Sequence, residues 1–124
     1  MVLTYPFDSI KSKEAELNAP RPLYLYVSSA YVSAFSNKTV FLEDEVNLDI
    51  TGYDWKNRRE KVSGFISNLN EKEGRNFLET NNIKYLYLAK AISPLPGEKL
   101  RLGESQLGLN NIFENQEVVI YEVK

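Results

Sequence analysis

The segment that most constrains this chain covers residues 39–59, TVFLEDEVNLDITGYDWKNRR. A short apolar stretch at residues 40–42 has the character of a strand, and it ends in three consecutive acids. After a polar loop, residues 52–55 (Gly-Tyr-Asp-Trp) open a basic amphipathic helix. A strand followed so closely by a helix favours a fold in which strands and helices alternate.

Composition excludes several classes of function. With 124 residues, the chain is expected to form one domain with a real core. Its formal net charge of -2 gives no electrostatic footprint for nucleic acid, so no nucleic-acid partner is predicted. The chain has no Cys and no His, which removes disulfides, zinc sites built on these residues, and Cys–His or Ser–His–Asp catalysis.

The sequence contains no candidate membrane helix. Its longest apolar runs are about five residues, whereas a membrane helix needs about twenty. No signal peptide is visible at the N-terminus either. We therefore expect the chain as given to be soluble, although a domain cut from a membrane protein would look the same.

The pattern predicts two regions. Residues 1–21 are polar and contain Pro6 and Pro20, so they are predicted to be an N-terminal linker or partly ordered leader, with a short ordered piece around residues 5–10. Residues 22–124 are predicted to form a single α/β domain.

Within that domain, strands and helices are predicted to alternate. Strands are expected at residues 23–27 (LYLYV), 39–42, 83–89 and 117–123, and helices at 30–35, 54–68 and from Asn70 to Asn82. Residues 92–104 contain two prolines and two glycines and are predicted to be a loop. Residues 112–113 and 118–120 flank a short polar turn, which is typical of an antiparallel hairpin.

The predicted fold class is α/β: a small three-layer Rossmann-like domain with a mixed sheet of about five strands and a C-terminal antiparallel hairpin. The strand at 23–27 is expected between those at 39–42 and 83–89, with the hairpin beyond. If so, tyrosines that alternate along the first and third strands line one face of the sheet: Tyr24, Tyr26, Tyr85 and Tyr87.

The three acids 43–45 follow a predicted parallel strand, where α/β folds bind ligands. Carboxylates could hold a divalent cation there. Adjacent strand residues point to opposite faces, however, so a solvated acidic loop is the favoured interpretation and no metal site or cofactor is predicted.

A second cluster comprises Asp54 and Arg58, which are one helical turn apart, and Arg59. An arginine here could bind an anionic group. The favoured interpretation is structural, with Trp55 in the core, Asp54 as helix cap and the arginines on a helix face.

Ser28 and Ser29 follow the predicted first strand. Without flanking glycines or any histidine, a helix cap is favoured over a nucleophile. If a ligand binds, the predicted site lies at the C-terminal ends of the central strands, near Ser28, Asp44 and Lys90, with Asp54 and Arg58 adding to it from the neighbouring helix.

Taken together, the elements resemble a known family. The resemblance rests on an apolar strand, a helix ending in Ser-Asn-Lys-Thr-Val, the motif Gly52-Tyr53-Asp54-Trp-x-x-Arg58, the run L-x-x-N-N-I-K-Y-L-Y-L, and a closing IFENQEVVIYEV hairpin. This pattern resembles the soluble C-terminal domain of polytopic membrane proteins of the lipid-linked-sugar glycosyltransferase superfamily. It covers residues 23–123. Asn37-Lys38 departs from the Gly-Arg of relatives, which weakens an anion-binding role for that turn.

The resemblance implies a non-catalytic accessory domain on the extracytoplasmic side of a membrane, within a parent protein of the glycosyltransferase class. It implies the membrane-embedded part of that parent as partner, and a glycan or lipid-linked sugar acceptor as ligand. No catalytic residue can be carried over, because the family's catalytic loops lie between membrane helices. The alternatives are a small-ligand or nucleotide-binding α/β module and, less favoured, a stand-alone hydrolase using carboxylates.

Overall fold

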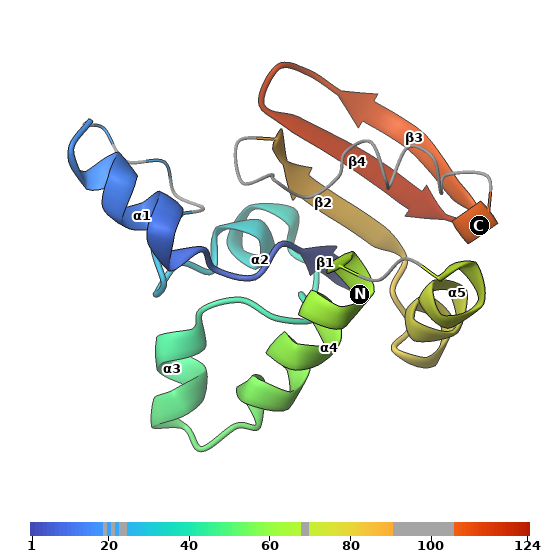
Figure 1. Cartoon of the computed structure of the whole chain (residues 1–124), viewed down its shortest axis with the longest axis horizontal. Coiled ribbons are helices and arrows are strands. Elements are labelled where there is room, and N and C mark those ends of the chain that lie inside the picture. The colour runs from blue at the N-terminus through green and yellow to red at the C-terminus, as the bar shows by residue number, and fades with distance from the viewer. Residues whose placement is uncertain (19, 21, 23–24, 68–69, 91–105) are drawn as a thin grey trace.

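A computed structural model gives the structure of residues 1–18, 20, 22, 25–67, 70–90 and 106–124. In this part of the chain the fold is α/β, with five helices and a mixed four-stranded sheet (Figure 1). The elements, in chain order, are β1 (Val2–Thr4), α1 (Ser9–Glu16), α2 (Tyr31–Ser36), α3 (Glu45–Ile50), α4 (Trp55–Ser67), α5 (Glu71–Thr80), β2 (Tyr85–Ala89), β3 (Leu109–Glu114) and β4 (Val118–Val123).

The strand order is β1-β2-β4-β3. β1 and β2 are parallel, whereas β4 runs antiparallel to both β2 and β3. The predicted C-terminal hairpin is therefore confirmed. The predicted strand at 39–42 is reduced to a single parallel bridge between Val40 and Val2, which lies on the far side of β1 from β2.

The start of the chain differs from the prediction. Residues 1–21 were expected to be a linker or partly ordered leader, but Val2 and Leu3 are buried in β1 and Ser9–Glu16 form α1. Both backbone polar groups of Val2 are hydrogen-bonded to residues 39–41: its amide donates to the Thr39 carbonyl, and its carbonyl accepts from the Phe41 amide. A three-residue strand carries too little sequence signal to outweigh a nearby proline-containing segment.

The strand predicted at 23–27 is also wrong for the residues that the structure describes. None of residues 25–27 lies in a strand, and the Leu25 amide donates locally to the Pro22 carbonyl; residues 23 and 24 lie outside the described part. The position predicted for this strand, between residues 39–42 (the Val40 segment) and the strand of residues 83–89, belongs to β1 instead. β1 holds this position by parallel pairing with residues 85–87 on one side and with Val40 on the other, although Pro6 follows it closely.

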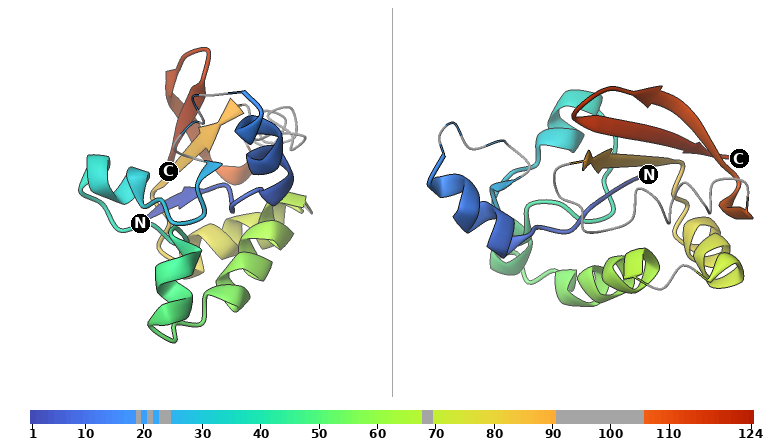
Figure 2. Two further views of the ribbon diagram at one scale, coloured as in Figure 1. Left: turned by 90° about the vertical axis from the view of Figure 1, so that its left-hand side faces the viewer. Right: turned by 45° about the horizontal axis from the view of Figure 1, so that its top comes forward.

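Helices lie on both faces of this sheet (Figure 2). Leu86 and Leu88 of β2 point into the main core together with side chains of α4 and α5. Tyr85 and Tyr87 alternate with them and therefore point to the opposite face, as predicted for these two tyrosines. There the ring of Tyr31, from α2, packs edge-on against Tyr87 with 5.9 Å between ring centroids.

The main core joins α4 and α5 to the sheet. The predicted apolar face of α4 is confirmed, since Val62, Phe65 and Ile66 are buried. Phe65 stacks on Phe77 of α5 at a centroid distance of 4.9 Å. Trp55, at the start of the same face, is only half-buried against the core.

The ends of α5 follow the sequence prediction closely. The Asn70 side chain caps its N-terminus by accepting from the Lys72 amide, at 3.1 Å. Beyond its C-terminus, Asn82 adopts the left-handed conformation with φ 52°. The loop predicted at 92–104 lies outside the described residues.

Candidate functional site

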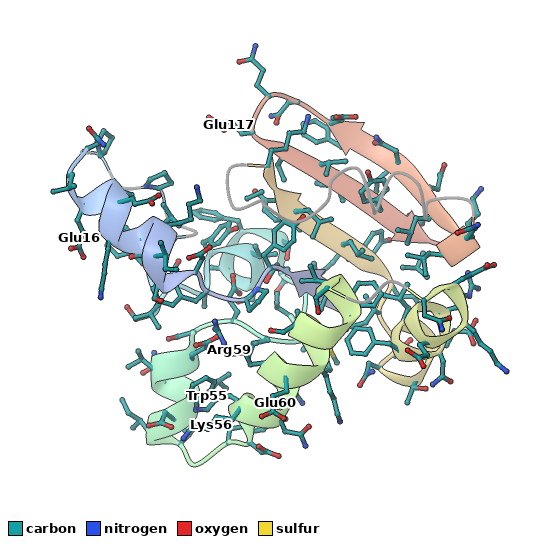
Figure 3. All side chains as sticks on the ribbon, viewed as in Figure 1. Glu16, Trp55, Lys56, Arg59, Glu60 and Glu117 are labelled. Carbon is teal, nitrogen blue, oxygen red and sulfur yellow. The ribbon has the colours of Figure 1, made fainter. Side chains whose placement is uncertain are left out.

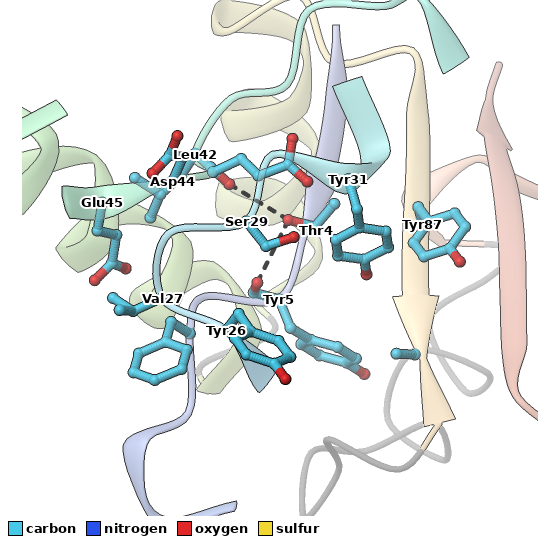
Figure 4. Close-up of a pocket in the computed structure, with 13 residues that line it drawn as sticks. Thr4, Tyr5, Tyr26, Val27, Ser29, Tyr31, Leu42, Asp44, Glu45 and Tyr87 are labelled. Atoms are coloured by element: carbon cyan, nitrogen blue, oxygen red, sulfur yellow. Dashed lines mark hydrogen bonds between the residues drawn. The ribbon is translucent and has the colours of Figure 1, made fainter. Parts of the chain in front are cut away.

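A small pocket opens at the C-terminal ends of β1 and β2 (Figure 4). Because these strands are parallel, Thr4 at the end of β1 and the following Tyr5 lie at the same edge of the sheet as Tyr87 and Ala89 at the end of β2. Residues 42–45, which follow the Val40 bridge, complete that edge. The cavity volume is about 40 Å³. At roughly 10–15 Å³ per water, it holds about three waters or an end group of similar size.

Two larger depressions lie elsewhere. One of about 240 Å³ lies between α4 and α5, and one of about 510 Å³ runs along α5. Most of the side chains that line them are exposed, including Lys61, Glu73 and Glu79, so these are open surface grooves. The strand-end pocket is the better candidate because the buried Tyr5 and the partly buried Tyr31 and Tyr87 line it together with carboxylates.

Glu43, on the wall of the pocket, caps helix α2 from outside that helix. Its two carboxylate oxygens accept from the amides of Val32 at 2.8 Å and Ser33 at 3.1 Å, and from the Ser33 hydroxyl at 2.9 Å. The residue at the N-cap position, Ala30, has no side chain able to do this. The predicted capping of this helix by Ser28 or Ser29 is therefore wrong, because the cap comes from the end of the Val40 segment.

Asp44 starts helix α3, which the sequence had suggested to be a polar loop. It adopts the left-handed conformation with φ 57°. Its carboxylate accepts from the Asn47 side-chain amide at 2.6 Å and, more weakly, from the Asn47 backbone amide at 3.4 Å. Asp44 thus lines the pocket and caps α3, and none of the ion pairs among the described residues includes it.

Glu45 is buried, with 8% of its surface exposed. It forms an ion pair with Arg59 of α4, and Arg59 also donates to the Phe7 carbonyl at 2.7 Å. The Arg59 guanidinium (Figure 3) therefore connects α4 to the segment after β1 and to residues 43–45, the acidic run. A buried carboxylate needs such a partner, because an unpaired charge is costly to desolvate.

Four tyrosines surround the pocket from four different segments: Tyr5, Tyr26, Tyr31 and Tyr87. Tyr5 is 9% exposed, and burial raises its pKa to about 12. Its phenol is therefore neutral across the physiological range. Among the described residues, the Tyr5 hydroxyl has no hydrogen-bond partner. Every fully enclosed side-chain polar atom in this part of the chain does have a partner, so the Tyr5 hydroxyl must be accessible to solvent. The hydroxyl is therefore available to a ligand.

The structure separates the residues that the sequence grouped into one site. Asp44 lines the pocket, whereas Ser28 is exposed and its neighbour Ser29 lines the pocket instead. The Lys90 ammonium pairs with Glu114 of β3 at 2.7 Å. Asp54 and Lys90 are not among the residues that line the pocket.

The motif residues at the start of α4 hold the fold together. Asp54 accepts from the Asn57 amide at 3.4 Å and so caps α4. The Arg58 guanidinium donates to the Phe41 carbonyl at 2.8 Å and to the Tyr53 hydroxyl at 2.6 Å. It also lies over both aromatic rings, 5.0 Å from the Phe41 centroid and 4.7 Å from that of Tyr53. The structural interpretation of this cluster fits the geometry.

Sequence reasoning missed the aromatic half of the pocket. Tyr5 was assigned to the leader, and Tyr26 was placed on a strand that does not exist in the described residues. Only the alternation of Tyr85 and Tyr87 was a usable signal. The pocket depends on four segments meeting, and local pattern does not carry that information.

Among the described residues, no group of three or more acidic side chains is arranged to hold a metal ion. No helix in the same residues has the length and apolar character needed to cross a membrane. No protein-family model matches the chain, and neither a curated protein nor a solved structure matches it significantly.

Proposed function

We propose that this chain is a non-catalytic accessory domain of a membrane glycosyltransferase-like protein, held on the extracytoplasmic side, where it positions an acceptor or a partner. The observation that carries the proposal is the role of the four positions on which the family resemblance rests. All four serve the fold, so the shared pattern describes a structural unit.

Each of these positions stabilises the join between α3, α4 and the sheet. Gly52 turns the chain with φ 70°. Asp54 caps α4, and Arg58 links the Tyr53 hydroxyl to the Phe41 carbonyl. An arginine with these contacts and two aromatic neighbours is poorly placed to bind substrate. The pattern therefore supports a shared fold with the accessory domains of that superfamily. In this proposal, the catalytic residues of the parent protein lie in segments outside this domain.

The same proposal extends to the fold family. The Val40 segment, β1 and β2 are parallel neighbours, with the first of them in sequence, β1, in the middle. α2 precedes the Val40 segment and α4 and α5 follow it, on opposite faces of the sheet. This arrangement supports a Rossmann-like fold in which the Val40 segment is a short fifth strand.

A turnover assay tests the non-catalytic part. The purified chain is incubated with nucleotide-sugar and polyprenyl-phosphate-sugar donors, and separately with ester and phosphate substrates. No turnover above the buffer blank is expected. Turnover that is abolished in Asp44→Asn would refute the proposal. Asp44 lines the pocket, and an Asn at this position can still cap α3, so the variant removes the charge and keeps the cap.

The second candidate is a small-ligand-binding module, and the position of the pocket favours it. Chains of this topology bind ligands where the strand order reverses, at the C-terminal edge beside the first strand. The pocket opens there, between the ends of β1 and β2. No Lys or Arg lies among the described residues that line it, whereas three carboxylates do. This charge favours a ligand other than a nucleotide.

A further inference from the structure

We infer that the pocket at the C-terminal ends of β1 and β2 binds a primary alkylammonium group, such as the end of a lysine side chain or of a free amine. The inference rests on the second candidate function, a small-ligand module, and names the class of its ligand. Four features of the pocket support it: charge, aromatic lining, an available hydroxyl and size.

The charge of the pocket is negative after its internal pairing is counted. Glu43, Asp44 and Glu45 line it. Glu45 is neutralised by Arg59, but the partners of Glu43 and Asp44 are amides and one hydroxyl, which carry no charge. Two carboxylates therefore remain without a cation among the ion pairs of the described residues. A cation is attracted to this place and a phosphate is repelled.

The aromatic lining has the matching property. The faces of tyrosine rings carry partial negative charge and attract ammonium groups. Figure 4 shows Tyr5 and Tyr26 in the lower part of the pocket and Tyr31 and Tyr87 to the right, with Asp44 and Glu45 at the left. An alkylammonium group can place its charge near the carboxylates and its methylene groups against these rings.

The Tyr5 hydroxyl supplies a specific contact. The side chain is about nine-tenths buried and lines the pocket, and its hydroxyl has no partner among the described residues. A phenol oxygen accepts a hydrogen bond from an ammonium N–H.

Size decides between end groups and larger ligands. The volume of about 40 Å³ corresponds to about three waters. This suits an ammonium group with its adjoining methylene, and it does not enclose a nucleobase or a pyranose ring. The pocket therefore recognises the end of a ligand whose remainder lies outside.

A chemical-shift titration of the full ¹⁵N-labelled chain tests the inference with three probes of equal length: butylammonium, 1-butanol and butyrate, at constant ionic strength. Butylammonium is expected to shift the amides of residues 4–5, 43–45 and 87–89 saturably, and the other two are not. Inorganic phosphate and AMP are the probes for anionic ligands. Equal shifts from 1-butanol, or shifts here from the anions, would overturn the ammonium inference while the small-ligand function survives. No shift with any of the five probes would reject both the ammonium inference and the small-ligand function.

Paired variants test the charge. Asp44→Asn keeps a residue that tolerates the left-handed conformation and caps helices, so the fold is expected to persist. Its affinity for butylammonium should fall about fivefold, the order expected for one carboxylate at close range. Asp54→Asn removes the same charge from the cap of α4, outside the pocket, and should change affinity less than about twofold. Equal affinities in the two variants would contradict the role of the acidic run.

A second pair tests the hydroxyl and the source of the ammonium group. Tyr5→Phe keeps the ring and should weaken butylammonium binding, and an unchanged affinity would remove Tyr5 from the site. Nα-acetyl-lysine methylamide and its Nε-acetylated form then separate the sources. Binding of the first only points to a lysine of a partner chain. Binding of butylammonium but of neither lysine compound points to a free amine, and binding of the Nε-acetylated form would overturn the inference.

Discussion

The Glu43 carboxylate lies at the N-terminus of α2 and holds Ser33 by its amide at 3.1 Å and its hydroxyl at 2.9 Å. The two residues are ten apart in sequence; Ser33 belongs to α2, whereas Glu43 lies between the Val40 bridge and α3. The contact fixes α2 to the chain that leaves the Val40 bridge. It therefore joins the helix on one face of the sheet to the wall of the pocket.

Loss of this cap should destabilise the domain. Glu43→Ala leaves the amides of Val32 and Ser33 without their acceptor, and we expect a loss of about 1–3 kcal/mol in the free energy of unfolding. Denaturant melts measure it. Glu60→Ala is the matched control, because Glu60 is exposed on α4 (Figure 3) and should change stability by less than about 0.5 kcal/mol. Equal losses in both variants would show that Glu43 is not a cap.

The ion pair between Glu45 and Arg59 should show strong coupling. Arg59→Met leaves a buried carboxylate unpaired and should cost about 2–4 kcal/mol, less than a fully buried pair because the Arg59 side chain is 36% exposed. Glu45→Gln in the same chain should recover part of that loss. A double-mutant cycle measures the coupling. Additive losses would contradict the pairing.

Two aromatic residues on α4 should differ in their contribution to the core. Phe65→Ala removes a buried ring stacked on Phe77 and should cost about 3–5 kcal/mol. Trp55 is half-buried, with its indole N–H donating to Asp49 at 2.9 Å, so Trp55→Ala should cost about 1–3 kcal/mol. Urea midpoints of the two variants test the order, and a larger loss at Trp55 would contradict the burial.

Tyr5 should make stability fall at high pH. Its pKa is raised to about 12 in the folded state by burial, above the usual 10, so the unfolded chain loses the proton first. The contribution of Tyr5 is complete below pH 10 and is lost as the pH rises toward 12, by on the order of 2 kcal/mol. Other tyrosines and lysines titrate in the same range. The difference between wild type and Tyr5→Phe isolates the effect, and a difference that is constant from pH 9 to 12 would contradict it.

The sequence predicted elements that carry their own local signal. α4 has apolar residues at helical spacing, α5 has Asn70 as its cap and Asn82 beyond its end, and the hairpin has a polar turn between apolar runs. In each case the residues that determine the structure are close in the sequence. Local pattern was therefore sufficient.

The remaining errors share one physical cause. β1 is three residues long and is defined by partners at residues 40 and 85–87, so its pairing is invisible in its own sequence. The cap of α2 comes from Glu43 rather than from the serines beside it. The pocket and the predicted ligand site both lie at the C-terminal edge of parallel strands, but only Asp44 among the predicted residues lines the pocket. Tertiary pairing decided each of these features.

The central claim is that this domain works as part of a larger membrane protein. Cells of the native host are separated into soluble and membrane fractions and probed with an antibody raised against the 124-residue chain. The account predicts a polypeptide several times larger than this chain in the membrane fraction, with the epitope cleaved by protease added outside the cytoplasmic membrane. A band of the chain's own size in the soluble fraction would contradict it.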